Sequence, residues 1–308
     1  MTYSGKEIKI KDGSEFFIHK WVNDNIEMAN IKGIVQIVHG AAEHAKRYSQ
    51  FAEKLNELGY VVIGDDHSGH GVMAKSDEKL GFFGEKDGWD RLVENEVVLT
   101  EYIMEQYPDK PIILFGHSMG SFIVRDYLTR DPKGISKCII CGTGYTNAVM
   151  TKLALYMVGL EKKQKGIMHR SVRIDKLTFG GFNKKFKPTR TDFDWLSREG
   201  KEVDKYIADE LCGFIFTVKG YEDLFTGVKY INSSEAFEKT AKNIPILMIS
   251  GAKDPVGDSG KGVTKVYKKL KNSGVEDITL KLYEEGRHEI LNEINRNDVY
   301  KDIIQWSE

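Results

Sequence analysis

Short apolar runs alternate with amphipathic runs along most of the chain. Residues Ile112–Phe115 are four successive apolar positions after a proline, a pattern typical of a buried strand. Apolar residues then recur at helical spacing from Phe122 to Leu128. The same alternation continues on both sides of this point. It predicts an α/β fold, in which a mainly parallel sheet has helices on both faces.

The pattern predicts an eight-stranded sheet. The expected strands share short apolar or alternating runs: Glu7–Lys11, Glu15–Trp21, Gly33–Val38, Tyr60–Gly64, Ile112–Phe115, Cys138–Gly142, Ile244–Gly251 and Ile278–Tyr283. Asp12-Gly13 predicts a hairpin between the first two strands. The expected helices share apolar positions three and four residues apart: Tyr48–Leu58, Glu94–Tyr107, Phe122–Leu128, Val263–Leu270 and Val299–Trp306.

The alternation stops between residues 145 and 236. No clean strand pattern is found there, and we predict a helical insertion, called the cap segment below, over a core formed by residues 1–144 and 237–308. Its charge is uneven, with ten Lys/Arg and two Asp/Glu from Glu161 to Arg190, then three and seven from Thr191 to Glu210. The two parts can neutralise each other as solvated surface, or the basic part can attract anionic lipid surfaces.

A Gly-x-Ser-x-Gly motif follows the Ile112–Phe115 strand, with Ser118 at its centre. A serine on a sharp turn from strand to helix is the nucleophile elbow of α/β-hydrolases. Gly116 and Gly120 fit this turn because larger side chains would collide there. The helix N-terminus behind the serine favours negative charge.

An acid and a histidine follow the serine in the order expected for such a hydrolase. Asp254 comes directly after one predicted strand and His288 after the next. His288 would accept the proton of Ser118, and Asp254 would orient the imidazole. Asp258 is a competing acid, but it lies farther from the strand end. The backbone N–H groups of Ala41 and Met119 are the expected oxyanion donors.

Net charge, the N-terminal sequence and the cysteine and histidine positions indicate which classes of protein to exclude. The net charge is −1, which gives no global attraction to nucleic acid. The N-terminus has no signal-peptide pattern and no apolar run is long enough to span a bilayer, so we expect a cytoplasmic protein. Cys138 and Cys141 lie three apart on a predicted strand, so they should face opposite sides as core thiols. The histidines near the motifs show no paired ligand spacing, and we expect no metal and no cofactor.

These motifs together resemble the monoacylglycerol lipase and bacterial lysophospholipase group of α/β-hydrolases, which is grouped with serine aminopeptidase-like hydrolases. The matching stretches share glycine, histidine and acidic residues near the site: 39–44 with Arg47-Tyr48, 66–71, 116–121, 251–256, 287–289, 193–198 and 211–214. The resemblance implies a cofactor-free serine esterase acting on monoacyl lipids or other small acyl esters, with the same triad and oxyanion donors. Ser68 departs from the arginine usual in the family, which puts a local ion pair in question.

The substrate stays open at this point. Short-chain or aryl esters are an alternative to monoacyl lipids, since the cap aromatics suit an acyl tunnel or ordinary packing equally: Phe179, Phe182, Phe186, Phe193, Trp195, Phe214 and Phe216. An aminopeptidase would need a cap acid, such as Glu199, Glu202 or Asp209, to hold a free amine. A catalytically inactive binding module is the last alternative.

Overall fold

The computed structural model describes residues 2–9 and 15–308. Its strands form one sheet in the order β1-β2-β4-β3-β5-β6-β7-β8. The strands are β1 Thr2–Lys9, β2 Glu15–Val22, β3 Gly33–Val38, β4 Tyr60–Asp65, β5 Ile112–His117, β6 Ile135–Cys141, β7 Ile246–Gly251 and β8 Ile278–Tyr283. Only the β1–β2 and β2–β4 pairs are antiparallel among these described strands. The predicted mainly parallel, eight-stranded sheet is confirmed. The Asp12-Gly13 turn lies outside the described residues.

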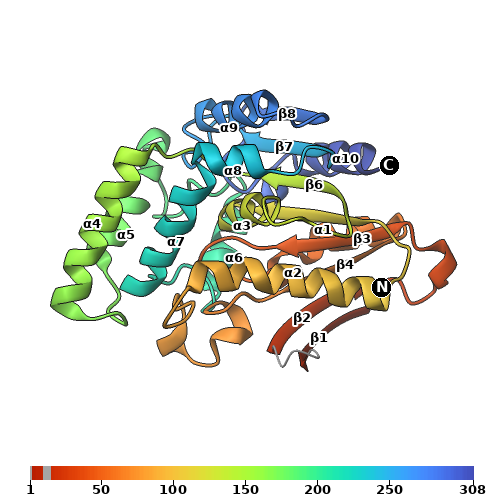
Figure 1. Ribbon diagram of the computed structural model, residues 1–308, viewed down its shortest axis with the longest axis horizontal. Helices are drawn as coiled ribbons and strands as arrows, with labels where there is room; N and C mark the ends of the chain where they lie inside the picture. The colour runs from red at the N-terminus through yellow and green to blue at the C-terminus, as the bar shows by residue number, and fades with distance from the viewer. Residues whose placement is uncertain (1, 10–14) are drawn as a thin grey trace.

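Helices cover both faces of the sheet (Figure 1). The α-helices are α1 Ser49–Glu57, α2 Gly88–Gln106, α3 Met119–Tyr127, α4 Ala148–Lys165, α5 Val172–Thr178, α6 Gly200–Ala208, α7 Val218–Ile231, α8 Ser234–Lys239, α9 Lys261–Asn272 and α10 Arg296–Ser307. Short 3-10 helices are η1 Met28–Asn30, η2 Ala45–Tyr48, η3 Gly71–Ala74, η4 Asp77–Lys79, η5 Phe182–Phe186 and η6 Ile290–Asn292. One apolar cluster joins the sheet to α2, α3, α8 and α9, and the other joins it to α1 and α10.

Alternation along the central strands explains this two-sided core. Cys138 packs in the first cluster and Cys141 in the second, as the strand period of two requires. Both thiols are fully buried, so the expectation of two core cysteines on opposite faces is confirmed. Strands buried on both faces read as continuous apolar runs, which is why the sequence predicts them well.

Four helices, α2, α3, α9 and α10, are longer than the sequence predicts. The helix expected from Glu94 begins at Gly88, and Trp89, Leu92 and Val93 extend its buried stripe toward the N-terminus. Helix α9 extends to Lys261–Asn272, beyond Val263–Leu270. The added ends of α9 are polar and carry no apolar signal, whereas the start of α2 carries apolar residues that the predicted helix leaves out.

The cap segment holds four α-helices, α4 to α7, and the start of α8 between β6 and β7. Helix α7 packs against both α4 and α3, so it joins the cap segment to the core. In Figure 1, α4 and α5 form one end of the molecule, beyond the sheet. Residues 145–236, all described, contribute no strand to the sheet, and their only bridge pairs Arg170 with Thr217. Among the described residues, no helix has the length and apolar character to cross a bilayer.

Candidate active site

Ser118 occupies a sharp turn between β5 and α3. Its backbone angles are φ 53° and ψ −118°, a conformation that L-residues rarely adopt and that costs free energy. A Cβ at Gly116 would lie 2.5 Å from the carbonyl oxygen of Gly120, and one at Gly120 would lie 2.0 Å from that of Val38. Both glycines are therefore required by close backbone approach. The strand, strained serine and helix form the elbow that the motif predicts.

Asp254 and His288 come from loops after β7 and β8 and meet in the interior. The His288 Nδ1 atom lies 3.0 Å from each carboxylate oxygen of Asp254. The Val256 amide also donates to Asp254 Oδ1 at 2.9 Å. Asp254 is 0% exposed and His288 2% exposed, so water does not compete for this hydrogen bond. No contact links Asp258 to His288 in the described chain, and the structure pairs the histidine with Asp254.

The loop after β3 lies directly against the serine. A Cβ at Gly40 would lie only 3.1 Å from the Cβ of Ser118. The Gly40 amide donates to Glu43 Oε1 at 2.6 Å, and Ala42 has φ 52°, which turns the chain sharply after Ala41. Met119 is the first residue of α3, so its amide has no acceptor within the helix. Met119 therefore directly follows Ser118, and Ala41 directly follows Gly40, the residue whose Cα lies against the serine side chain.

A network of buried charged side chains supports this loop. The Arg47 guanidinium donates to both oxygens of Glu289, at 2.7 and 2.8 Å, and also to Glu43. Tyr48 donates its hydroxyl to Glu43 Oε1 at 2.8 Å. Burial raises the pKa of Glu43 and of Glu289, but the charge of Arg47 and the interactions with His117 together outweigh it and hold both pKa values below their ordinary range. The sequence shows these residues in its motifs but gives no sign that they pair.

His117, directly before the serine, links this network to His288. Its Nδ1 lies 3.4 Å from Glu43 Oε1, and its Nε2 lies 3.3 Å from the His288 carbonyl oxygen. Burial would lower the pKa of His117, but the hydrogen bond and charge of Glu43 raise it overall. An imidazolium that donates at both nitrogens would fix the backbone of His288 relative to β5.

A second buried cluster lies behind the loop, where His67 faces two acids. Its Nδ1 lies 3.4 Å from Asp65 Oδ1 and 3.3 Å from Glu96 Oε1. Burial opposes the charged imidazole, but the two acids raise its pKa to about 10. Burial and the charge of Asp65 raise the pKa of Glu96 to about 8. His67 Nε2 reaches the His39 carbonyl oxygen at 3.2 Å, so the cluster holds the start of the serine-facing loop.

Ser118 and His288 open into one cavity of about 580 Å³ under the cap segment. This volume is typical of a small-molecule site. Five of the seven cap aromatics line it: Phe179, Phe193, Trp195, Phe214 and Phe216. The remaining two, Phe182 and Phe186, pack with the small cluster around Trp195 instead. Five of these aromatics are thus placed where a ligand could contact them, and the acyl-tunnel interpretation stays a prediction.

The cap segment also holds the His288 loop, which the sequence does not predict. The His288 amide donates to the Trp195 carbonyl oxygen at 3.4 Å, and the Glu289 amide donates to that of Leu196 at 2.7 Å. The rings of Trp195 and His288 lie 5.1 Å apart. Arg198 Nε donates to Glu293 Oε2 at 2.9 Å. The stretch 193–198 therefore forms a fixed junction between cap segment and core.

The cap acids proposed for an aminopeptidase are occupied elsewhere. Glu199 caps the N-terminus of α6, and Glu202 pairs with Lys205. Asp209 pairs with His44. None of the three acids lines the cavity. They are therefore not placed to hold a substrate amine there.

Comparison with known proteins fits this geometry. Residues 29–295 match the family described as serine aminopeptidase, S33. A monoacylglycerol lipase of Mycolicibacterium smegmatis is 28% identical over 278 residues, covering 89% of this chain and 88% of that protein. The monoglyceride lipase of Mus musculus is 27% identical, covering 96% of this chain and 87% of that protein.

A solved structure extends the comparison to the fold. The carboxyl esterase from Bacillus coagulans, crystallised in complex with glycerol, is 30% identical with a TM-score of 0.88. The alignment covers 99% of this chain and 98% of the esterase. The family match includes the strands from β3 to β8, the cap segment and the site residues. The chain belongs to the serine aminopeptidase S33 family and has the α/β-hydrolase fold.

Proposed function

We propose that this protein is a serine hydrolase that cleaves carboxylic esters of monoacylglycerol or lysophospholipid type through an acyl-enzyme. The observation that carries the proposal is the buried Asp254–His288 pair, which shares with Ser118 a cavity lined by aromatic side chains. Two relatives that align along most of their length are lipases of monoacylglycerols, and the esterase structure contains glycerol. No residue beyond those of the chain is needed for the chemistry.

In this mechanism His288 Nε2 takes the hydroxyl proton as Ser118 Oγ attacks the ester carbonyl carbon. Asp254 accepts the hydrogen bond from Nδ1 and stabilises the imidazolium. The amides of Ala41 and Met119 donate to the negative oxygen of the tetrahedral intermediate. The proton then passes to the leaving alcohol as the C–O bond breaks, and water hydrolyses the acyl-serine by the same steps in reverse order.

The division of the chain follows from this assignment. Residues 1–144 and 237–308 carry the catalytic groups, and the cap segment, 145–236, serves as the lid that selects the acyl group. The aromatic wall of the cavity suits an acyl chain, because burying apolar surface contributes roughly 25 cal/mol per Å².

The outer face of the lid would meet lipid surfaces. Here the cap face denotes Val149, Leu153, Tyr156, Val172 and Leu177, which are exposed apolar residues of α4 and α5. Basic side chains flank it: Lys152, Lys165, Arg173 and Lys176. A groove of about 700 Å³ separates the two helices. Exposed apolar residues beside basic ones favour transient contact with an anionic bilayer, where monoacyl lipids reside.

The test is labelling with a fluorophosphonate together with a panel of esters. We expect labelling at Ser118, a burst with p-nitrophenyl acetate, and turnover of monoacylglycerols from butyryl to oleoyl, all lost in Ser118→Ala. Faster turnover of the aryl or butyryl esters than of the oleoyl ester would favour the short-chain esterase. Hydrolysis of aminoacyl-naphthylamides alone would favour an aminopeptidase. An unlabelled Ser118 would leave only a binding module.

A further inference from the structure

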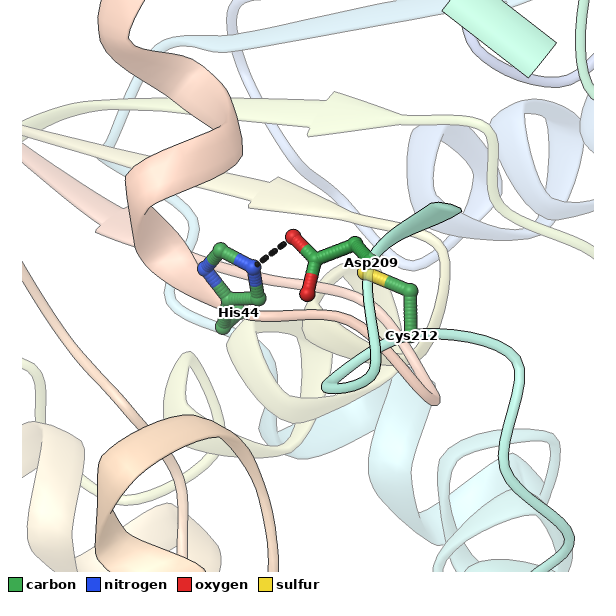
Figure 2. Close-up of side chains that lie close together, drawn as sticks. All are labelled: His44, Asp209 and Cys212. Carbon is green, nitrogen blue, oxygen red and sulfur yellow. Dashed lines mark hydrogen bonds and ion pairs between the residues drawn. The ribbon is translucent and has the colours of Figure 1, made fainter. Parts of the chain in front are cut away.

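Three side chains with different metal-binding atoms converge where the cap segment meets the loop after β3. Figure 2 shows the imidazole of His44 facing the carboxylate of Asp209, with the sulfur of Cys212 on the other side of that carboxylate. One ligand atom from each lies within 4.8 Å of the other two. The His44 Nε2 to Asp209 Oδ2 distance is 2.9 Å. His44 belongs to the core and the other two residues to the cap segment, so the group bridges the two.

The backbone holds this group in place without any ion. The Cys212 amide donates to the Asp209 carbonyl oxygen at 3.0 Å, which closes a tight turn. The next amide, of Gly213, donates to the Ala42 carbonyl oxygen at 2.9 Å, and the Tyr206 hydroxyl donates to the same oxygen at 3.0 Å. Both loops are therefore fixed against each other on either side of the three side chains. A preformed arrangement reduces the ordering cost of binding.

The set of donor atoms favours zinc. Imidazole nitrogen, carboxylate oxygen and cysteine sulfur are its usual ligands, and three protein ligands leave a fourth position for water. Aspartate and a cysteine thiolate together would neutralise a divalent ion. The carboxylate of Asp209 is 34% exposed, so an ion can enter from solvent. Burial raises the pKa of the Cys212 thiol, so binding must release its proton.

A second group of possible metal ligands in the described chain differs because solvent does not reach it. Asp65, His67 and Glu96 also lie within reach of one ion. All three are fully buried, with no path from solvent, and Gln36 already donates to Glu96 Oε2 at 2.8 Å. The group at the cap junction, by contrast, is open to solvent on the side of Asp209.

We propose that His44, Asp209 and Cys212 form a zinc-binding site that ties the cap segment to the loop carrying Ala41. Occupancy would join two loops that otherwise meet through a few hydrogen bonds. An ion that binds the folded chain and not the unfolded chain raises the melting temperature with its concentration. The site does not depend on the proposed hydrolase activity, because none of its residues belongs to the triad.

The experiment uses the full chain, treated with a chelator and kept reduced, and titrates it with Co²⁺ and then Zn²⁺. We expect a thiolate-to-cobalt charge-transfer band, displaced by one equivalent of Zn²⁺ per chain, and a melting temperature that rises with Zn²⁺ but not with Mg²⁺. Cys212→Ser should abolish the band, and His44→Gln or Asp209→Asn should weaken Zn²⁺ binding by about tenfold or more. His169→Asn, which changes a half-exposed cap histidine beside Glu161, is the matched control and should bind as wild type.

Metal-free melting curves show whether each variant is folded, so a loss of binding is not confused with a loss of structure. The proposal is overturned if the wild-type chain gives no charge-transfer band, or if Cys212→Ser keeps it. It is also overturned if His44→Gln and Asp209→Asn, both folded, bind Zn²⁺ as tightly as wild type.

Discussion

The loops at the carboxyl edge of the sheet and the cap segment above them bury their side chains very differently. At the sheet edge, Asp254 and His288 are almost wholly enclosed and hydrogen-bonded. On the outer face of the cap segment, Val149 is 75% exposed and Leu177 66% exposed. Proton transfer needs fixed distances in a dry site, whereas an apolar ligand needs accessible apolar surface. The difference is consistent with the proposal that the sheet edge carries the chemistry and the cap segment contacts lipid.

The largest effect should come from neutralising the acid at the sheet edge. Asp254→Asn keeps the size of the side chain but favours the wrong tautomer of His288. We expect kcat for a p-nitrophenyl ester to fall by about 10,000-fold, with the melting temperature little changed. Asp258→Asn, four residues along the same loop, is the control and should retain wild-type kcat. Equal losses of kcat in both variants would mean that the conformation of the loop, and not the Asp254–His288 hydrogen bond, governs the reaction.

A smaller effect, on stability, is expected in the network of buried charged side chains at the sheet edge. In Glu289→Gln the Arg47 guanidinium keeps only Glu43 as an ionic partner, and we expect a loss of about 2 kcal/mol of unfolding free energy at pH 7. The pKa of Glu289 lies below its ordinary value of 4.5. Its stabilisation is therefore complete above pH 4.5 and is lost as the pH falls through the folded-state pKa.

Urea unfolding of the wild type and Glu289→Gln at several pH values measures this directly. The gap between the two proteins should shrink on acidification below pH 4.5. Glu235→Gln, which breaks an exposed pair with Lys239, should show almost no gap at any pH. A gap for Glu289→Gln that stays constant with pH would contradict the assigned role of its charge.

The smallest effect should come from the cap face. Leu153→Glu and Leu177→Glu replace exposed apolar residues, so we expect partition onto phosphatidylglycerol vesicles to fall by about tenfold for each. Hydrolysis of a water-soluble aryl ester should not change, because neither residue lines the cavity. Met28→Glu, exposed on η1 at the opposite edge of the sheet, is the control. Unchanged partition in both cap variants would assign lipid contact to another surface.

The sequence predicts the sheet edge better than the cap segment, for physical reasons. Strands such as β5 are buried on both faces, and their apolar runs identify them directly. Ser118 and Asp254 each follow such a strand, and His288 follows the alternating edge strand β8, so topology alone brings all three to one edge. The geometry of the structure agrees with their predicted convergence, and their catalytic roles stay proposals.

Contacts between distant loops leave no such trace in the sequence. Nothing near Trp195 indicates that its carbonyl oxygen receives the His288 amide, 93 residues later. The same is true of His44 and Asp209, which are separated by 165 positions. The expectation of no metal rested on the lack of local ligand spacing, and a site assembled from two loops has none.

The position of the cap segment between β6 and β7 has a consequence for how such a chain can change. These two strands are neighbours in the sheet, with Cys141 opposite Ile249. The chain leaves the sheet after β6 and returns at the adjacent strand β7. The cap segment is therefore one long connection whose two ends lie side by side. The entropy cost of closing a loop grows only with the logarithm of its length, by about 0.6 kcal/mol for each doubling. Insertions or deletions in the outer turns of α4 and α5, away from α7 and the 193–198 junction, would therefore reshape the proposed lid at little cost in the stability of the sheet.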